Sequence, residues 1–80
     1  MQRTELKLLR IKHGFSQDKM AVRLGYSRNH YAAIENGKRE PTLKLVEALT
    51  IAFGLSLAEA VEVLKRDDEK KKNDRKTRGE

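Results

Sequence analysis

The sequence predicts an all-α domain, a bundle of five short helices without a β-strand. Apolar residues recur three or four positions apart along most of the chain, which is the period of helices buried on one face. Three of the expected helices lie between a Ser or Thr that can cap the first turn and a Gly that can end the last turn. Eighty residues are enough for one small domain.

The first helix is expected over residues 4–13, and Gly14 ends it. The second and third helices are expected over residues 17–24 and 28–36, with Ser16 and Ser27 as their N-caps. Only three residues separate these two helices, and so short a turn forces the steep crossing of a helix-turn-helix. The residues expected to face inward are Leu6, Leu9 and Phe15, then Met20, Ala21 and Leu24, then Tyr31 and Ile34.

The fourth helix is expected over residues 43–53, between Thr42 and Gly54. The fifth begins after Ser56, where the letters SLAE match a capping box, and we expect it to extend and fray over residues 65–72. The predicted core face of the fourth helix is Leu43, Val46, Leu49 and Phe53. A second apolar face on it comprises Leu45, Ala48 and Ile51.

The charge of the chain favours a polyanionic partner. It has 18 Lys and Arg against 12 Asp and Glu, a net charge of +6 and a pI of about 9.8. Residues 65–80, KRDDEKKKNDRKTRGE, contain no apolar residue and cannot bury surface to offset the entropy of ordering. We therefore expect a folded domain over residues 3–66 and a charged, partly disordered C-terminal tail over residues 67–80.

Several classes of function find no support in the residues. The chain has no cysteine, and His13 and His30 are too isolated to suggest a metal site, so no metal or cofactor is expected. No grouping of acid, base and nucleophile suggests an enzyme. No apolar run could span a bilayer, and MQRTELK lacks the apolar stretch of a signal peptide. A cytoplasmic protein without a membrane partner is the plain interpretation.

Three segments resemble one family in order and spacing: LKLLRIKHGFSQDKMAVRLGYS, IENGKREPTL and EALTIAFGLSL. They are similar to the Cro/repressor (Xre-type) family of helix-turn-helix proteins, over about residues 6–64. The resemblance implies a five-helix lambda repressor-like fold, with the helix-turn-helix at about residues 17–36. It also implies sequence-specific binding of double-stranded DNA, usually by a repressor or activator on a two-fold operator.

The third helix carries the candidate base contacts. In a helix-turn-helix the start of the second helix reaches base edges in the major groove. Arg28 can bridge guanine O6 and N7, Asn29 can pair with adenine, and Ala33 is small enough to meet a thymine methyl. The base-reading positions of the family fall on the same three residues. The alternative for Arg28 and Asn29 is an ordinary solvated surface.

Candidate phosphate contacts frame that helix. Gln17 lies in the first turn of the second helix, where free N–H groups favour an anion, and the matching Gln of the family touches phosphate. The other candidates are Ser27, His30, Asn36, Lys38 and Arg39. His30 has a second interpretation, as filler of the corner between the helices. Lys38 and Arg39 have one too, as a solvated turn.

The resemblance also assigns structural roles. In several family members the residues at Arg10 and Glu35 form a partly buried ion pair between the first helix and the end of the third. Leu8 and Ile11 are apolar at positions where the family is usually polar. The second face of the fourth helix departs from the family in the same way. A long fifth helix folding back, or a second subunit, would cover these stripes. The homodimer interface expected on this ground is Leu57, Val61, Leu64 and Ile51.

The leading functional prediction is a small DNA-binding transcriptional regulator, a repressor of the kind that phages and mobile elements carry. The alternative is an antitoxin or anti-regulator that acts mainly through a protein partner, such as a toxin or an anti-repressor.

Overall fold

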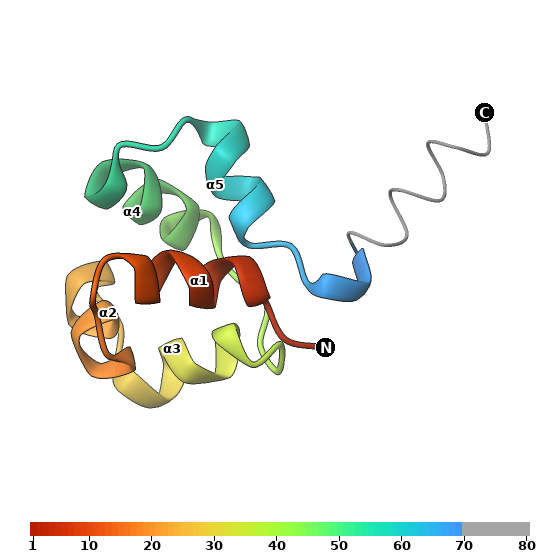
Figure 1. The fold of residues 1–80 in the computed structure, drawn as a ribbon, viewed down its shortest axis with the longest axis horizontal. Coiled ribbons are helices and arrows are strands. Elements are labelled where there is room, and N and C mark those ends of the chain that lie inside the picture. The colour runs from red at the N-terminus through yellow and green to blue at the C-terminus, as the bar shows by residue number, and fades with distance from the viewer. Residues whose placement is uncertain (70–80) are drawn as a thin grey trace.

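The computed structural model of the protein describes residues 1–69 and leaves residues 70–80 undescribed. Helices are the only regular elements in the described part, which confirms the predicted all-α class. In Figure 1, α1 crosses the middle of the molecule with α3 below it and α4 and α5 above it. The helices are α1 (Thr4–Lys12), α2 (Gln17–Leu24), α3 (Arg28–Glu35), α4 (Leu43–Phe53) and α5 (Leu57–Val63). Residues 67–69 are also helical.

Four helices begin at the capping residues that the sequence predicts. In each, a side-chain hydroxyl accepts a hydrogen bond from the backbone N–H three residues later, which satisfies a donor that the helix leaves free. At α5 the capping box is complete, because the Glu59 carboxylate also accepts from the Ser56 N–H. The caps are Ser16, Ser27, Thr42 and Ser56.

The core lies between α1 and the four helices around it. Its fully buried side chains come from every helix, and Phe15, Phe53 and Leu55 pack against them at half burial. The buried hydrophobic residues are Leu6, Met20, Ala21, Leu24, Tyr31, Ile34, Leu45, Leu49, Ala60 and Leu64. The inward faces predicted for α1, α2 and α3 agree with this list, with Leu9 and Phe15 half-buried rather than buried.

The predicted core face of α4 was wrong at its start. Leu43 is 70% exposed, whereas Leu45, assigned to the second face, is fully buried. Leu43 is the first residue of the helix, and its side chain stays outside the bundle. The buried stripe instead runs through Leu45 and Leu49, which are one helical turn apart.

The fifth helix is shorter than predicted, because it ends at Val63 instead of extending over residues 65–72. The Leu64 side chain is buried, and the Arg3 Nε donates to the Leu64 carbonyl at 2.6 Å. A guanidinium thus satisfies a carbonyl that a longer helix would have paired internally. The last three residues of that predicted extension lie outside the described residues, as does most of the predicted disordered tail.

The N-terminal segment packs against the turn after α3. Gly37 has a φ of +82°, and a Cβ there would overlap the carbonyl oxygen of Met1. The Arg3 N–H donates to the Glu35 carbonyl at 2.8 Å. Glycine is therefore required at this position both by the backbone conformation and by the close approach of the N-terminal segment.

Candidate nucleic-acid interface

The start of α3 presents polar side chains that nothing else in the described chain engages. Ser27 caps the helix by accepting from the His30 N–H at 3.1 Å. Arg28 and Asn29 follow it, both exposed and neither hydrogen-bonded within residues 1–69. Ala33, one turn later, is half-buried, and its short side chain does not project beyond those of Arg28 and Asn29. The three residues predicted to meet bases therefore lie along one solvent-facing side of α3.

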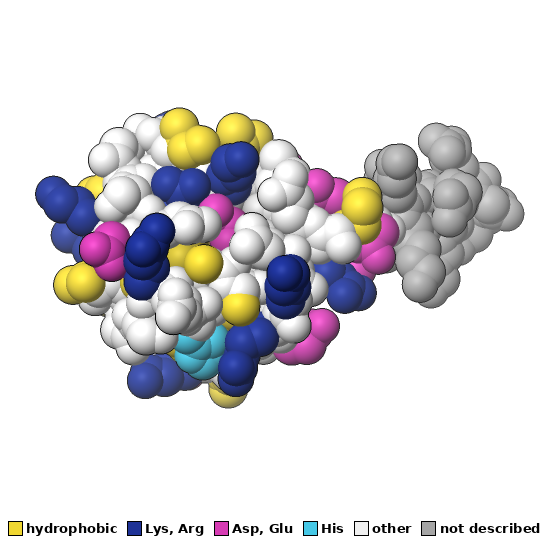
Figure 2. Space-filling view, turned by 90° about the horizontal axis from the view of Figure 1, so that it is seen from below, with side chains coloured by type: hydrophobic (Ala, Val, Ile, Leu, Met, Phe, Trp, Pro, Cys, Tyr) yellow, Lys and Arg dark blue, Asp and Glu magenta, His cyan; other side chains and the backbone are white. Residues whose placement is uncertain are grey.

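The opposite side of α3 holds the helix on the domain. Tyr31 and Ile34 are fully buried, as the sequence predicts. Tyr31 is thus a core residue. Figure 2 views the molecule from the side of α3, and Lys and Arg side chains are spread across that face.

The turn after α3 supplies further polar and basic groups. Gly37 adopts the left-handed conformation, and the Lys38 and Arg39 N–H groups both donate to the Ala33 carbonyl, at 2.8 and 3.2 Å. These bonds close the helix end and fix the direction of the turn. Asn36, Lys38 and Arg39 are all exposed, so their side chains stand free for an external anion.

His30 fills the corner between α2 and α3. Its ring is half-buried and meets the Tyr26 ring edge-on, with centroids 4.9 Å apart. The Tyr26 hydroxyl in turn lies 2.9 Å from the Thr42 Oγ1 at the start of α4. Of the two interpretations that the sequence left open, the corner-filling one describes the contact that the structure contains, and a phosphate contact stays a prediction.

Gln17 is engaged inside the domain. Its Nε2 donates to the Glu35 Oε1 at 3.0 Å, which joins the first turn of α2 to the end of α3. A phosphate at this helix end would meet the backbone N–H groups of the first turn, or would compete with Glu35 for the amide. The sequence did not reveal this contact, which holds the Gln17 side chain against Glu35. The phosphate contact of Gln17 stays a prediction.

Glu35 is the centre of a buried polar cluster. Its carboxylate receives two bonds from Arg10, Nε to Oε2 at 2.9 Å and Nη2 to Oε1 at 3.2 Å, so the pair is bidentate. The Tyr31 hydroxyl donates to Oε2 at 2.6 Å. Arg10 also donates to the Phe15 carbonyl at 2.8 Å. The contact implied by the family resemblance between Arg10 and Glu35 is thus present, and it links α1, the loop before α2 and α3.

The cluster holds Glu35 in its charged form. Burial disfavours the carboxylate, but the hydrogen bonds from Arg10, Tyr31 and Gln17 outweigh it, and the pKa of Glu35 lies below its ordinary value. The hydrogen bond to Glu35 raises the pKa of Arg10. Burial, reinforced by the bond to the carboxylate, raises the pKa of Tyr31. All three groups therefore keep one protonation state around neutral pH.

Sequence reasoning missed Arg3, whose side chain is 1% exposed. Its guanidinium donates to the carbonyls of Leu64 and Ile34, each at 2.6 Å, and of Arg39 at 3.1 Å. Glu40 lies 3.5 Å from it. The Ile34 and Leu64 carbonyls lie at the ends of α3 and α5, where the helix dipoles are negative, so the cation suits the site. No periodicity marks an arginine that precedes the first helix, and nothing in the sequence could have distinguished it from a surface charge.

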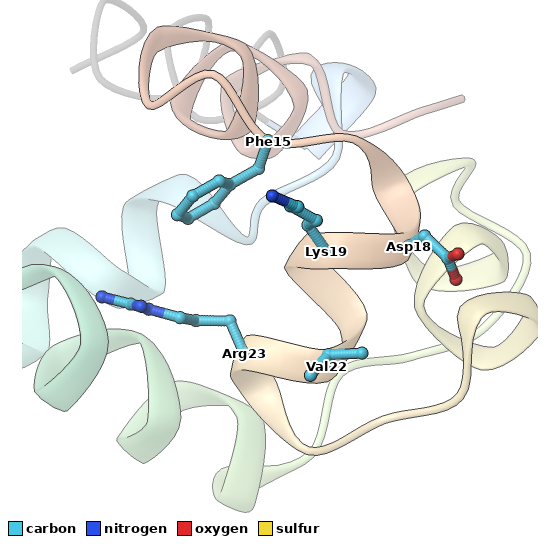
Figure 3. A pocket seen from close by; sticks show the side chains of 5 residues that line it. All are labelled: Phe15, Asp18, Lys19, Val22 and Arg23. Atoms are coloured by element: carbon cyan, nitrogen blue, oxygen red, sulfur yellow. The ribbon is translucent and has the colours of Figure 1, made fainter.

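A shallow hollow of about 460 Å³ lies on the outer side of α2. Phe15 and Arg23 extend along one side of it, the guanidinium 5.6 Å from the ring centroid, whereas Asp18 points away from them (Figure 3). Residues 1–69 contain no group of three metal-ligating side chains. No helix within the same residues is long and apolar enough to cross a membrane.

Comparisons with known proteins point to one family. The model of the helix-turn-helix family matches residues 6–59. The chain is 38% identical to an uncharacterized HTH-type transcriptional regulator of Methanocaldococcus jannaschii, over 69% of this chain and 83% of that protein. It is 33% identical to the cryptic phage CTXphi transcriptional repressor RstR of Vibrio cholerae, over 72% of this chain and 52% of that protein. It is 36% identical to the control protein C.MunI of Mycoplasma sp, over 66% of this chain and 72% of that protein.

No solved structure gave a significant match. The chain belongs to the Cro/repressor (Xre-type) helix-turn-helix family. It is a DNA-binding transcriptional regulator, and this family is not a class of enzymes.

Proposed function

We propose that this protein is a repressor that binds a two-fold DNA operator sequence-specifically, with α3 lying in the major groove. The observation that carries the proposal is the pair Arg28 and Asn29 at the start of α3. Both are exposed and unbonded within the described chain, on a helix whose other side is locked into the core. Long polar side chains on a rigid helix start are what base readout requires.

Each of the three residues has a distinct role in this proposal. Arg28 donates two hydrogen bonds to guanine O6 and N7, and Asn29 pairs with the N6 and N7 of adenine. Ala33 carries no side chain that would hold the helix away from the groove, and its methyl group meets a thymine methyl. A bidentate contact of this kind contributes about 1–3 kcal/mol of discrimination against the wrong base.

Contacts to phosphate orient α3 without reading sequence. Lys38 and Arg39 meet the backbone from the exposed turn after α3. Gln17 contributes through the first turn of α2, where the N–H groups and the helix dipole favour an anion. The full set of proposed phosphate contacts is Gln17, Ser27, His30, Asn36, Lys38 and Arg39.

A two-fold operator calls for a homodimer, because one α3 reads only a few base pairs. Ile51, Leu57 and Val61 are 84%, 62% and 45% exposed, so they are available to a second subunit. The sequence placed Leu64 in the same interface, and that prediction is wrong, because Leu64 is 4% exposed and packs in the core of its own chain. The proposed interface therefore consists of the other three residues.

The test is selection of binding duplexes from a random DNA pool, followed by fluorescence anisotropy with the selected duplex and a scrambled one. We expect the double variant Arg28→Ala/Asn29→Ala to lose the preference for the selected duplex by at least about tenfold, which is one good base contact. The matched control is Lys12→Ala, which removes an exposed charge from the side of α1 that borders Val63 of α5. This variant should keep the preference for the selected duplex.

Two outcomes would contradict the proposal. The double variant could keep the full preference for the selected duplex, which would move base readout away from α3. Alternatively, no duplex could be selected while a second protein co-purifies, which would favour the antitoxin or anti-regulator function. Repression itself is measured with a reporter gene placed behind the selected site, where an activator would raise expression instead.

A further inference from the structure

Two apolar side chains of α1 stay uncovered in the fold. Leu8 and Ile11 lie one helical turn apart and are 55% and 51% exposed. We expected either a long fifth helix folding back or a second subunit to cover them. The fifth helix does not do so, because α5 ends at Val63. These residues therefore belong to a surface that the domain itself leaves open.

A groove runs beside Leu8, between α1 and α5. It consists of two hollows of about 380 and 220 Å³ that share Glu5 and Val63. Its apolar lining is Leu8 and Leu9 from α1, and Leu55, Ala58 and Val63 from the opposite side. Leu8 and Ala58 are exposed, and the other three are half-buried. We call this surface the α1–α5 groove. An apolar groove between two helices has the shape into which a third helix packs.

The rim of the α1–α5 groove is acidic, although the chain carries a net charge of +6. The charged residues that line it in the described chain are Glu5, Glu59, Glu62 and Lys12, all exposed. Glu62 also lies 3.0 Å from the Lys65 Nζ, but a surface pair of this kind contributes little and a cation from a partner can replace it. The excess of carboxylates disfavours DNA at the groove and favours a cationic partner.

The α1–α5 groove is separate from the surfaces proposed for DNA and for the dimer. α3 lies on one side of α1 and α5 on the other (Figure 1). On α5, Val63 follows Val61 by two residues, so their side chains point about 200° apart around the helix. A dimer formed through Leu57 and Val61 therefore leaves the groove open, and so does DNA bound at α3.

We propose that the α1–α5 groove binds a basic amphipathic helix of another protein. Apolar side chains of that helix pack on Leu8 and Val63, and its lysines or arginines face Glu59 and Glu62. α1 has nine residues and is about 13 Å long, which matches about two to three turns of a partner helix. Anchors at positions i, i+4 and i+7 of the partner fit that length. So short a contact suits a transient complex.

A second copy of this chain is the competing occupant. The outer face of α2 carries Val22, which is 77% exposed, between the exposed Lys19 and Arg23 (Figure 3). That face has the chemistry that the groove favours. The contact would join different patches of the two copies, and contacts of this type build open chains unless a rotation closes them. A separate partner instead fills each groove once, which a dimeric regulator accommodates without polymerising.

The experiment selects random peptides of about 16 residues, about four helical turns, displayed on phage, against the immobilised full chain. We expect the enriched peptides to be basic, with apolar residues at i, i+4 and i+7. Fluorescence anisotropy with a labelled synthetic copy of one such peptide then measures affinity. Leu8→Gln should weaken binding by about tenfold, because the exposed half of a leucine is no longer buried by the peptide. Glu59→Gln/Glu62→Gln should weaken it by about threefold at low salt, and by less at high salt.

The matched control is Val22→Gln, which makes the same kind of change at an exposed apolar residue outside the groove. It should leave the affinity for the peptide unaltered. All variants should melt with the unaltered chain, since Leu8 and Glu62 are exposed and a Gln at position 59 keeps the capping box. Leu8→Gln should also bind the selected duplex as the unaltered chain does, which confines the loss to the groove.

Each of the remaining outcomes overturns the inference. Enrichment of acidic peptides, or of no peptide, means that the groove does not favour a basic helix. A peptide that binds Leu8→Gln as tightly as the unaltered chain, or that Val22→Gln weakens, occupies another site. If Leu8→Gln abolishes self-association of the free chain in sedimentation equilibrium, a second copy fills the groove. None of these results touches the proposed function, which is tested separately by the selection of a duplex.

Discussion

Replacing Arg10 with Met should strand a charge inside the domain. The side chains of Arg10 and Glu35 are only 12% and 3% exposed, and the Met variant leaves the carboxylate without its cation. Breaking a buried pair by removing one partner costs about 3–5 kcal/mol. Tyr31 and Gln17 still donate to the carboxylate in the variant, so we expect a loss near the lower end, about 3 kcal/mol.

Thermal unfolding followed by circular dichroism measures this loss directly. In a domain of this size each kcal/mol shifts the melting temperature by about 4–8 °C, so the midpoint should fall by roughly 12–24 °C at neutral pH. The single variant Glu35→Gln and the double variant Arg10→Met/Glu35→Gln complete a mutant cycle. The double variant should be more stable than Arg10→Met alone, because it no longer holds an unpaired charge.

The pH dependence provides a second readout of the same reasoning. In Arg10→Met burial is no longer offset by the guanidinium, so the pKa of Glu35 should rise and the carboxyl should protonate more readily. The stability gap between the variant and the unaltered chain should therefore narrow as the pH falls from 7 towards 4. A melting temperature equal to that of the unaltered chain, or a double variant no better than Arg10→Met, would refute the argument that the cost comes from a stranded charge.

Four further outcomes follow from particular contacts. Gly37→Ala should destabilise more than Gly25→Ala in urea unfolding: both glycines have a φ of +82°, which costs Ala about 1–2 kcal/mol, but only at Gly37 would the new Cβ meet the Met1 backbone. Equal losses would contradict this. Arg3→Met should cost about 2–4 kcal/mol, because it strands two buried hydrogen-bonded carbonyls, and hydrogen exchange should quicken at the ends of α3 and α5. Ala33→Glu should abolish operator binding by clash and repulsion yet melt within a few degrees of the unaltered chain, as anisotropy and circular dichroism would record. The depressed pKa of Glu35 adds stability above the ordinary pKa of 4.5 that is lost as pH falls through the folded value, so Glu35→Gln should flatten the acid limb of an unfolding-versus-pH curve.

Local rules were sufficient to predict the helices and their caps. A hydroxyl at an N-cap and a glycine at a helix end act within a few residues, so Ser16, Ser27 and Thr42 could be assigned without knowing the fold. The same local rules could not decide which of the two apolar faces of α4 is buried. Leu43 and Leu45 are equally hydrophobic, and only the entry direction of the chain into the bundle decides that Leu45 is buried.

Long-range polar contacts account for the remaining surprises. Arg3 binds a carbonyl 61 residues away, and the same contact coincides with the early end of α5. The sequence contains a hydrophobic Leu64 in helical register, which predicts a continuing helix, but the register says nothing about which group will satisfy the Leu64 carbonyl. The contact between Gln17 and Glu35 was missed for the same reason, because both residues had local interpretations that were sufficient by themselves.

The position of Glu35 connects the fold to the proposed reading of DNA. Arg10 holds it from α1, Gln17 from the start of α2 and Tyr31 from one turn back in α3, so a single carboxylate fixes three elements relative to one another. Arg28 and Asn29 lie two turns earlier on the same rigid helix, and a rotation of α3 by even part of a turn would carry them away from the bases. Losing the charge at Glu35 should therefore weaken operator preference before the domain unfolds, because satisfied buried networks specify one arrangement where apolar packing tolerates several.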